Sequence, residues 1–535
     1  MEPTPKGISH TWRGVALLVL IYPRLIPLLA AGVVAVLAPC RAFPADPSPR
    51  VDPSPAGEAA PAEEPLWVPP DPWATFVYEN PAPIYRLRLA AEQLSIQSIA
   101  FVGYLWWDPA PSYPGVPPMT AWEKLTLARR WTFDNDSLET NYIGHSGAGI
   151  LYWLTARGNR VSVPEAFLWT LGASTFWEII EFKEPMSIND LLVTPVAGMA
   201  VGEAFTQLSG YFDRLGTDGL SQTLAWIFNP VKKFHDWIDK ATPVRDPATR
   251  GWHEFKLSVS GGVLTQGGPV HGAAQFAFTS RLFRVPGYGE PGGTGHSFAD
   301  GNVSSIGITT TFAAGQMVDF LFDVETALLG HYARDLRRDG DDLHGWDLFV
   351  GGTAAYEIGS HVWNLSEGGT TNKISGVRFP GLDVRGRIFS GPCRVTAAGD
   401  ASLGMAGVEP FHAPDSLPNG VYYPTVYVAN GYYHALSLHL AALLEITWDS
   451  LGAGVAARTD LYSEFTGPFI PSPPGPVTTM DDGRTCASAW VRFRIEDPSL
   501  EFSVRGEWRD RWGSVGAQRL SEQERALFGS CALVF

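Results

Sequence analysis

The segment LEFSVRGEW, residues 500–508, alternates apolar and polar side chains without a break. Leu500, Phe502 and Val504 share one parity, and Glu501, Ser503 and Arg505 share the other. Since successive side chains of a β-strand point to opposite faces, this stretch is predicted to form a strand with one apolar and one polar face. The apolar face could line a sandwich core or face lipid in a membrane barrel, and alternation alone does not distinguish the two.

The same alternation recurs along the 284 residues from Trp252 to Phe535. It is clear in QMVDFLFDVE (316–325), ALSLHLAALLEITW (435–448) and CASAWVRFRIE (486–496). About twelve segments of roughly ten residues are expected; they begin near residues 252, 271, 303, 316, 345, 382, 394, 435, 452, 486, 499 and 526. The strand number is therefore predicted as about 12, with 10 or 14 as alternatives, because the connections between the first four segments do not alternate between short and long.

Two further features favour a transmembrane antiparallel β-barrel. The chain ends in CALVF (531–535), which resembles the C-terminal signal of bacterial outer-membrane barrels. We therefore expect an outer-membrane barrel over residues 246–535, with outer-membrane lipids as partners and with Phe535 recognised by the barrel assembly machinery. Aromatic residues also gather near segment ends, as in interfacial girdles; they are Trp252, Trp346, Tyr432, Tyr433, Trp448, Trp508 and Trp512.

Residues 1–42 have the features of a signal peptide. Lys6 and Arg13 precede an apolar run whose uninterrupted part, Leu25–Ala38, is 14 residues long. That length fits a signal-peptide core and falls short of the roughly 20 residues needed to span a bilayer. Cleavage is expected after Ala42, with a retained membrane anchor and lipidation at a cysteine as weaker alternatives.

Residues 43–72 contain ten prolines and are predicted to form a disordered tether. Over residues 73–245 the apolar positions recur at helical spacing instead. Helices are expected over 121–133, 141–158, 164–182 and 187–212, with a shorter one near 221–240. The longest apolar runs in these helices are 12 residues, so a compact bundle is favoured over membrane spans. The predicted fold class is α+β and multidomain, with the helical bundle ahead of the barrel.

Three of the expected helices carry polar residues on otherwise apolar faces. Spacings of three and four place such residues on one side of a helix, so the helices could bring them together in one buried site. The residues are Asn141 and His145; Glu178 and Glu181; and Ser187, Asn189, Asp190 and Glu203.

The stretches NYIGH (141–145), WEIIE (177–181), SIND (187–190) and GMAVGE (198–203) resemble an uncharacterised bacterial family called domain of unknown function 3943. The order of signal peptide, helical part and terminal barrel also matches that family, and the family-like core is expected at residues 121–212. The residue after the histidine is commonly Pro in the family and is Ser146 here. More loosely, the helical part is similar to small membrane-associated families of the VanZ type. The resemblance implies location and architecture and no reaction.

The polar set has a catalytic and a structural interpretation. In the first, His145 is a general base oriented by Glu178 or Asp190, with Glu181 as a charge partner, and its target is a lipid or envelope ester reachable from the inner leaflet. In the second, the residues form a buried hydrogen-bonded network that includes a cap at the start of the third helix. Asn141, Ser187, Asn189 and Glu203 are expected to belong to that network.

A metal site built from His145, Glu178, Glu181 and Asp190 would have a single histidine and no paired Glu-x-x-His motifs. No metal ion and no cofactor are therefore expected. The composition also argues against nucleic acid as a partner, because 55 acidic residues outnumber 39 basic ones.

Three functions remain open from the sequence, and whether the protein is an enzyme is uncertain. The leading one is a structural or binding role in the cell envelope, with the helical domain on the periplasmic side of the outer membrane or plugging the barrel lumen. The second is an enzyme that modifies envelope lipid or lipopolysaccharide, and the third is a solute channel.

Overall fold

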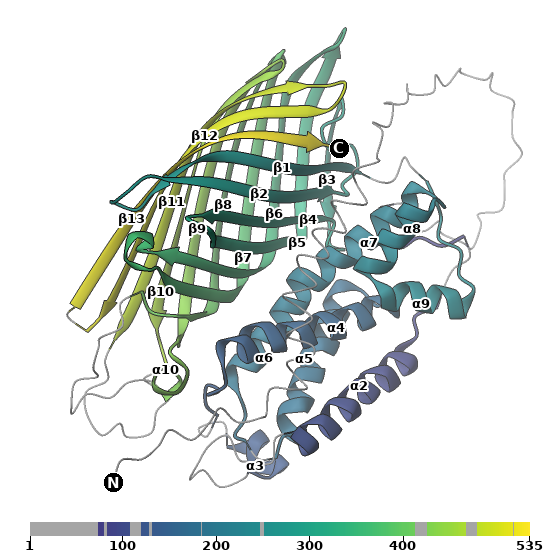
Figure 1. The fold of residues 1–535 in the computed structure, drawn as a ribbon. Coiled ribbons are helices and arrows are strands. Elements are labelled where there is room, and N and C mark those ends of the chain that lie inside the picture. Colours follow the sequence, from purple (N-terminus) through teal and green to yellow (C-terminus); the bar gives the residue numbers. More distant parts are fainter. Residues whose placement is uncertain are drawn as a thin grey trace, which may run out of the picture.

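The computed structural model describes residues 73–79, 83–107, 119–127, 131–182, 184–246, 251–411, 425–466, 479–516 and 518–535. The expected signal peptide and the tether lie outside the described residues. Within them the chain forms a set of helices followed by a β-barrel, as predicted (Figure 1).

The helical part is richer than the sequence pattern predicted. It contains α2 (Arg86–Trp107), α3 (Ala121–Thr126), the π-helix η3 (Thr140–Gly144), α4 (His145–Gly158), α5 (Val163–Ile180), α6 (Ile188–Ala197), the π-helix η4 (Gly198–Gly202), α7 (Glu203–Leu215), α8 (Gly219–Phe228) and α9 (Pro230–Asp239). The helix expected over 121–133 ends at Thr126, and α2 was not expected at all. The stretch Ile188–Leu215 is long and apolar enough to cross a membrane, and 83% of its most apolar window is buried inside the structure.

Side chains that satisfy free backbone N–H groups fix where the helices begin. Thr120 and Glu123 form a reciprocal capping box on α3. The Ser162 hydroxyl accepts from the backbone N–H of Glu165 at the start of α5. Ser187 does the same for Asp190 at the start of α6, which confirms the expected cap.

Twelve strands close into a ring, which confirms the predicted number. The ring order is β5-β4-β2-β1-β13-β12-β11-β10-β9-β8-β7-β6, and β6 pairs with β5 to close it. A thirteenth strand, β3 (Gly292–Phe298), pairs only with the far part of β5. The ring strands are β1 (Trp252–Thr265), β2 (His271–Phe283), β4 (Val303–Ala313), β5 (Gln316–Asp339), β6 (Asp342–Trp363), β7 (Thr370–Gly391), β8 (Cys393–Val408), β9 (Tyr433–Trp448), β10 (Leu451–Glu464), β11 (Met480–Ile495), β12 (Leu500–Val515) and β13 (Gln518–Val534).

The two rims of the barrel differ in their connections. The turn end carries the short connections 340–341, 392, 449–450 and 496–499, the longer connection 284–302 that contains β3, and the C-terminal Phe535. The loop end carries the two long connections 409–432 and 465–479, besides four short ones. In outer-membrane barrels short turns lie in the periplasm and long loops outside the cell.

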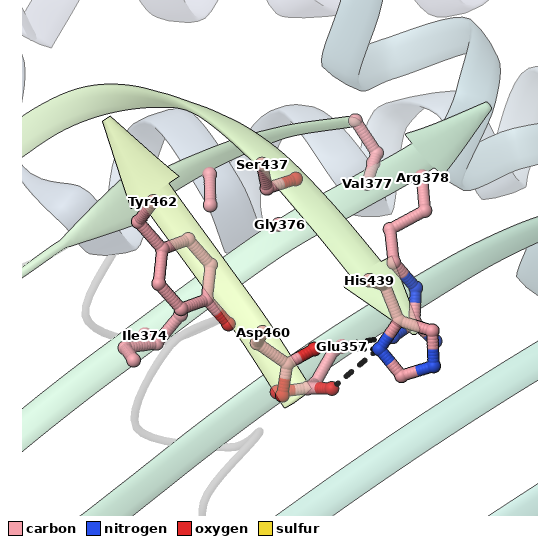
Figure 2. Close-up of a pocket in the computed structure, with 10 residues that line it drawn as sticks. Glu357, Ile374, Gly376, Val377, Arg378, Ser437, His439, Asp460 and Tyr462 are labelled. Atoms are coloured by element: carbon pink, nitrogen blue, oxygen red, sulfur yellow. Dashed lines mark hydrogen bonds and ion pairs between the residues drawn. The ribbon is translucent and has the colours of Figure 1, made fainter. Parts of the chain in front are cut away.

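Ion pairs that cross the ring identify the lumen-facing side chains. Arg509 on β12 lies 3.2 Å from Asp319 on β5, although four strands separate β5 from β12 on the shorter path around the ring. A second cluster brings Glu357, Arg378 and His439 together with Asp460, as Figure 2 shows. The polar parity of the strands therefore faces inward and the apolar parity faces outward, as a membrane barrel requires.

The helices pack against the side chains of the strands that point out of the barrel. Thr326, next to the inward-facing Glu325, donates to the backbone carbonyl of Ala200 at 2.8 Å. Tyr356, next to Glu357, donates to the carbonyl of Tyr142 at 2.5 Å. The expectation that the helices plug the lumen is not supported by these contacts, because the described helices bind the opposite face of the wall (Figure 1).

The wall residues under the helices follow one register line of the sheet. Ser280 links the first two members, since it pairs with both Phe255 on β1 and Ile306 on β4. Direct cross-strand pairing then joins Ile306, Val324, Tyr356, Val377 and Met405 in that order. All but Ser280 belong to the core shared with the helices. Phe255 lies near the turn end of β1, whereas Met405 lies near the loop end of β8, so the contact crosses the wall diagonally.

Candidate functional site

The structure brings three ionisable side chains of the helical domain together near the loop end. Asp134 lies in the loop before η3, His145 is the first residue of α4, and Asp190 lies in the first turn of α6. One nitrogen of His145 and one carboxylate oxygen of each aspartate lie within 4.8 Å of one another. We refer to Asp134, His145 and Asp190 as the Asp–His–Asp cluster.

His145 is the accessible member of this cluster. Its Nε2 lies 3.5 Å from the Asp190 carboxylate, and its side chain is 19% exposed against 2% for Asp190. It follows directly on the π-helix η3, and single-turn π-helices occur often at functional sites. An outside molecule would therefore meet the imidazole, with the carboxylates behind it.

Hydrogen bonds hold both carboxylates in place. Asn189 donates from its amide to Asp190 at 2.7 Å, and its side-chain oxygen accepts from the backbone N–H of Asp134 at 2.7 Å. Asp134 also accepts from the backbone N–H groups of Asn135 and Asp136. Burial raises the pKa of the Asp134 carboxyl well above its usual range, and the negative charges of Asp136 and Asp190 raise that pKa further.

Glu178 and Ser187 support the cluster without touching His145 in any contact found among the described residues. The Glu178 carboxylate accepts from the backbone N–H of Ser187 at 2.6 Å, and the Ser187 hydroxyl donates to Asn189 at 2.9 Å. The ammonium of Lys124 donates to the backbone carbonyls of Glu178 and Glu181 and so joins α3 to the end of α5. These contacts give Glu178, Ser187 and Asn189 positioning roles in the described structure.

Asn141 belongs to the junction with the barrel. Its amide donates to the Tyr432 hydroxyl at 2.7 Å, next to the loop end of β9. One residue along, the Tyr142 hydroxyl is 2.8 Å from Nδ1 of His434, whose Nε2 is 3.0 Å from the carbonyl of Asp134. The loop that carries Asp134 is therefore fixed directly by a barrel histidine.

Glu203 lies in a separate cluster at the other end of α4. Its carboxylate accepts from Arg157 and from the Trp153 indole, both at 2.9 Å. Arg157 also binds Asp300, in the connection between β3 and β4, at 2.7 Å. The expectation of one converging polar site thus holds for α4 and the start of α6, whereas Glu203 ties the helices to the turn end of the barrel.

Two groups of the site were not expected from the sequence. Asp134 was placed beyond the end of an expected helix and was given no role, and its only signal is the string DNDS (134–137), typical of a polar turn. His434 stands between Tyr433 and an apparent strand, where the aromatic pattern suggested only a girdle. The sequence separation of Asp134 or His434 from His145 does not indicate that either residue lies near it.

The donor set of the Asp–His–Asp cluster is one imidazole nitrogen and two carboxylates, which suits a divalent cation such as zinc or manganese. Both carboxylates are already engaged by backbone and amide donors, which leaves fewer oxygen lone pairs for an ion. That the protein functions without a metal ion stays a prediction.

The fold and the site define an outer-membrane type β-barrel that carries a helical domain with a buried polar cluster on its outer wall. Residues 130–231 match the model of the family described as domain of unknown function (DUF3943), so the chain carries the domain that its motifs resembled. That match includes the whole Asp–His–Asp cluster. No curated protein sequence matches the chain.

Solved structures that match are outer-membrane proteins with low identity. The β domain of the Bordetella autotransporter BrkA is 11% identical, covers 53% of this chain and 99% of its own, and has a TM-score of 0.23. A loop-deletion mutant of the Vibrio cholerae outer membrane protein OmpT is 9% identical over 53% of this chain and 99% of its own, with a TM-score of 0.19. Pseudomonas aeruginosa OprD is 8% identical over 53% and 94%, with a TM-score of 0.13. The barrel assignment here rests on the strand pairing.

Proposed function

We propose that this protein is an outer-membrane enzyme that uses His145 for acid–base chemistry on an ester of an envelope lipid, with the barrel as its closed scaffold. The observation that supports this most is the accessibility of His145 beside two buried carboxylates. Burial lowers the pKa of His145, so the imidazole is neutral and able to accept a proton, while the charge of Asp134 raises that pKa in part.

The chemistry that fits is hydrolysis or transfer of an acyl group. His145 would take a proton from water or from an acceptor hydroxyl as that oxygen attacks the ester carbonyl. The negative charge of Asp134 would favour the imidazolium that forms, because it raises the pKa of His145 against the lowering effect of burial. When the tetrahedral intermediate collapses, the ester C–O bond breaks and the imidazolium returns its proton to the leaving alkoxide, which restores neutral His145.

The place of the site supports a lipid substrate. Asp134 and Asn141 are bonded to His434 and Tyr432, which lie at the loop end of β9. They are bonded on the outward-facing side of the wall, where a barrel meets the membrane. If the loop end lies outside the cell, as in other outer-membrane barrels, the substrate is a lipid of the outer leaflet rather than the inner one.

The lumen argues against a solute channel. Arg458 on β10 binds both Glu357 on β6 and Asp460, and Arg484 on β11 binds the same two carboxylates. A cavity of about 160 Å³ is lined partly by these arginines and by Asp319 and His361. Paired charges therefore reach across the barrel interior and divide the space that an open pore would need.

The test is a comparison of outer-membrane lipids by mass spectrometry in cells that make the wild-type protein, His145→Gln or Asp190→Asn. Barrel levels are matched by heat-modifiable migration on gels. His331→Gln is the control, because His331 is an exposed histidine on β5 outside the helical domain. We expect both site variants to change the same lipid species and the control to change none. A wild-type lipid pattern in His145→Gln at full barrel level overturns the enzymatic function and leaves the cluster a structural or binding role.

A further inference from the structure

We propose that the helical domain lies within the hydrocarbon layer of the outer membrane, beside the barrel wall, with the outer faces of α2, α5 and α9 against lipid acyl chains. This differs from the periplasmic or luminal positions expected from the sequence. It does not rest on the proposed enzymatic function, because the observations below concern surfaces remote from the Asp–His–Asp cluster.

The height of the contact on the barrel is the first observation. The wall residues under the helices run from Phe255 near the turn end to Met405 near the loop end. Strands lie about 4.8 Å apart and tilt by about 35–45° in such barrels, so six strand steps rise about 20 Å along the barrel axis. The apolar band of an outer-membrane barrel is about 25 Å tall. The helices therefore cover the wall through most of the membrane.

The wall under the helices is also more polar than the rest. Thr326, Tyr356 and His434 point outward and bond to helical residues. Outward positions away from the helices are apolar and exposed instead; they include Val259, Phe276, Val455, Val491, Val504 and Leu527. An unpaired hydroxyl or imidazole facing hydrocarbon would be costly, so this part of the wall is suited to a helical partner at membrane depth.

The outer face of α2 presents no charge over most of its length. From Gln93 to Trp107 the helix has no Asp, Glu, Lys or Arg, and Ile99 and Trp106 are 75% and 79% exposed. A surface helix of a domain in water carries charged residues on its outer face. Here the outer face has the composition of a lipid-facing helix.

Four polar side chains in this part of α2 donate hydrogen bonds within the domain. Gln93 and Gln97 are buried and donate to backbone carbonyls of α4 and α5. Ser95 and Ser98 donate back to carbonyls one turn earlier on α2, at 2.7 Å each. The side-chain donors of these four residues therefore do not need water, as a helix in hydrocarbon requires.

α5 continues this surface. Leu168 and Phe176 are exposed on it, and the Thr175 hydroxyl donates back to the carbonyl of Leu171. Its only charged residues are Glu165, in the first turn, and the buried Glu178. Glu165 pairs with Arg86 at the start of α2, so the exposed charges of both helices gather at one end.

α9 has its polar and apolar faces reversed relative to a soluble helix. Lys232, Lys233, His235 and Asp236 are buried, and their partners include Asp213 and Glu92. Phe234, Trp237 and Ile238 are exposed, Trp237 by 71%. Val244, a few residues after α9, bonds to Val77 before the chain enters β1 at the turn end. An outward-facing Trp and Phe at that level fit the interfacial region of a bilayer.

Lipid is the occupant that these surfaces favour over a protein partner. Exposed apolar side chains cover α2 and α5, and others such as Val259 and Phe276 continue on β1 and β2 beyond the helices. A bilayer covers all of these surfaces at once. A single protein partner would have to cover three helices and leave the adjoining barrel wall to lipid.

Fluorescence quenching in proteoliposomes tests this placement on the full-length protein. The four cysteines are replaced by serine, and Ile99→Cys, Leu168→Cys and Trp237→Cys are each labelled with a small environment-sensitive fluorophore. Val504→Cys on the barrel wall is the lipid-facing control, and Asp341→Cys in the 340–341 turn is the water-facing control. The vesicles contain phosphatidylethanolamine and phosphatidylglycerol, with or without brominated acyl chains, and aqueous iodide is the second quencher.

We expect bromolipid to quench the three helical labels as strongly as the Val504→Cys label, and iodide to quench only the Asp341→Cys label. Iodide quenching of the helical labels at the level of Asp341→Cys would place the domain in water and overturn the proposal. Protection from both quenchers would assign the surface to a second copy or to another protein, which also overturns it. Bromolipid quenching of native tryptophan, compared between wild type and Trp237→Phe, gives the same readout without labels.

Discussion

The hydroxyl of Tyr356, on the outer wall of β6, donates a 2.5 Å hydrogen bond to the backbone carbonyl of Tyr142 in η3. Tyr142 precedes His145 by three residues, and its own hydroxyl reaches His434 of β9. The segment that presents His145 is thus held by two strands of the barrel. The barrel is therefore part of the site's architecture as well as its anchor.

We expect Tyr356→Phe to weaken docking of η3 while leaving the barrel intact. The change removes one donor to the Tyr142 carbonyl, which still accepts from the Ser146 hydroxyl at 2.8 Å, so the expected cost is the loss of one hydrogen bond, about 0.5–1.5 kcal/mol. The loss of stability is measured by unfolding the helical domain in urea, with protease cleavage near residues 140–145 as the readout. Tyr462→Phe is the control, because Tyr462 lies on the lumen side. Equal stability of the two variants would show that the Tyr356 bond does not hold the segment.

The sequence predicted the barrel well because alternation persists wherever a strand separates lumen from lipid. β7 begins at Thr370 rather than near 382, since its first residues meet helices instead of lipid: Lys373 binds Glu139 and Val377 packs in the shared core. α2 was missed for a related reason. Its apolar residues lie on both the buried and the exposed face, so helical periodicity is weak.

The candidate site was only partly predictable. The cap of Ser187 on Asp190 follows from local sequence rules, and the proximity of His145 to Asp190 follows from helix faces. Asp134 and His434 join the site through tertiary packing across 300 residues of chain, which no local spacing encodes. Glu203 lies 13 residues after Asp190, more than three helical turns along the chain, so it meets Arg157 instead.

The buried Arg157 is expected to be essential for the turn-end junction. It binds Glu203 and Asp300 at once, so Arg157→Met leaves two carboxylates without their cation, at a cost of about 3–5 kcal/mol. The temperature at which the helical circular dichroism signal is lost should be well below that of the wild type. Arg86→Met is the matched control, since the Arg86–Glu165 pair is exposed to water and contributes little to stability. A similar, small effect for both arginines would refute the role of the Arg157 cluster.

A closed lumen predicts low conductance in planar bilayers. Arg458 and Arg484 both bind Glu357 across the interior, so replacing both with Ala removes the cations that hold this bridge. We expect the wild type to show little or no current and the double variant to show frequent openings. Arg494→Ala serves as the control, because Arg494 lies 3.7 Å from Glu254 near the turn end. Large, stable pores in the wild type would restore the channel function.

The crossing of α4 and α6 requires glycine at two positions. A Cβ on Gly149 would lie 1.8 Å from the carbonyl oxygen of Thr194, and one on Gly198 would lie 2.5 Å from the carbonyl oxygen of Gly149. Gly149→Ala would force the two helices apart just where they align His145 with Asp190, and such overpacking costs about 1–3 kcal/mol or more.

Gly147→Ala provides the matched comparison on the same helix. A Cβ there meets nothing within 4 Å, so this change should leave stability equal or raise it by about 0.5–1 kcal/mol. The measurement is the unfolding midpoint of the helical domain together with the lipid profile of the cells. Because close packing of the two helices brings the imidazole to its carboxylates, Gly149→Ala should lose lipid modification even at a temperature where the barrel remains folded. Unchanged lipids in cells with Gly149→Ala would show that the activity of the cluster does not depend on the close crossing of α4 and α6.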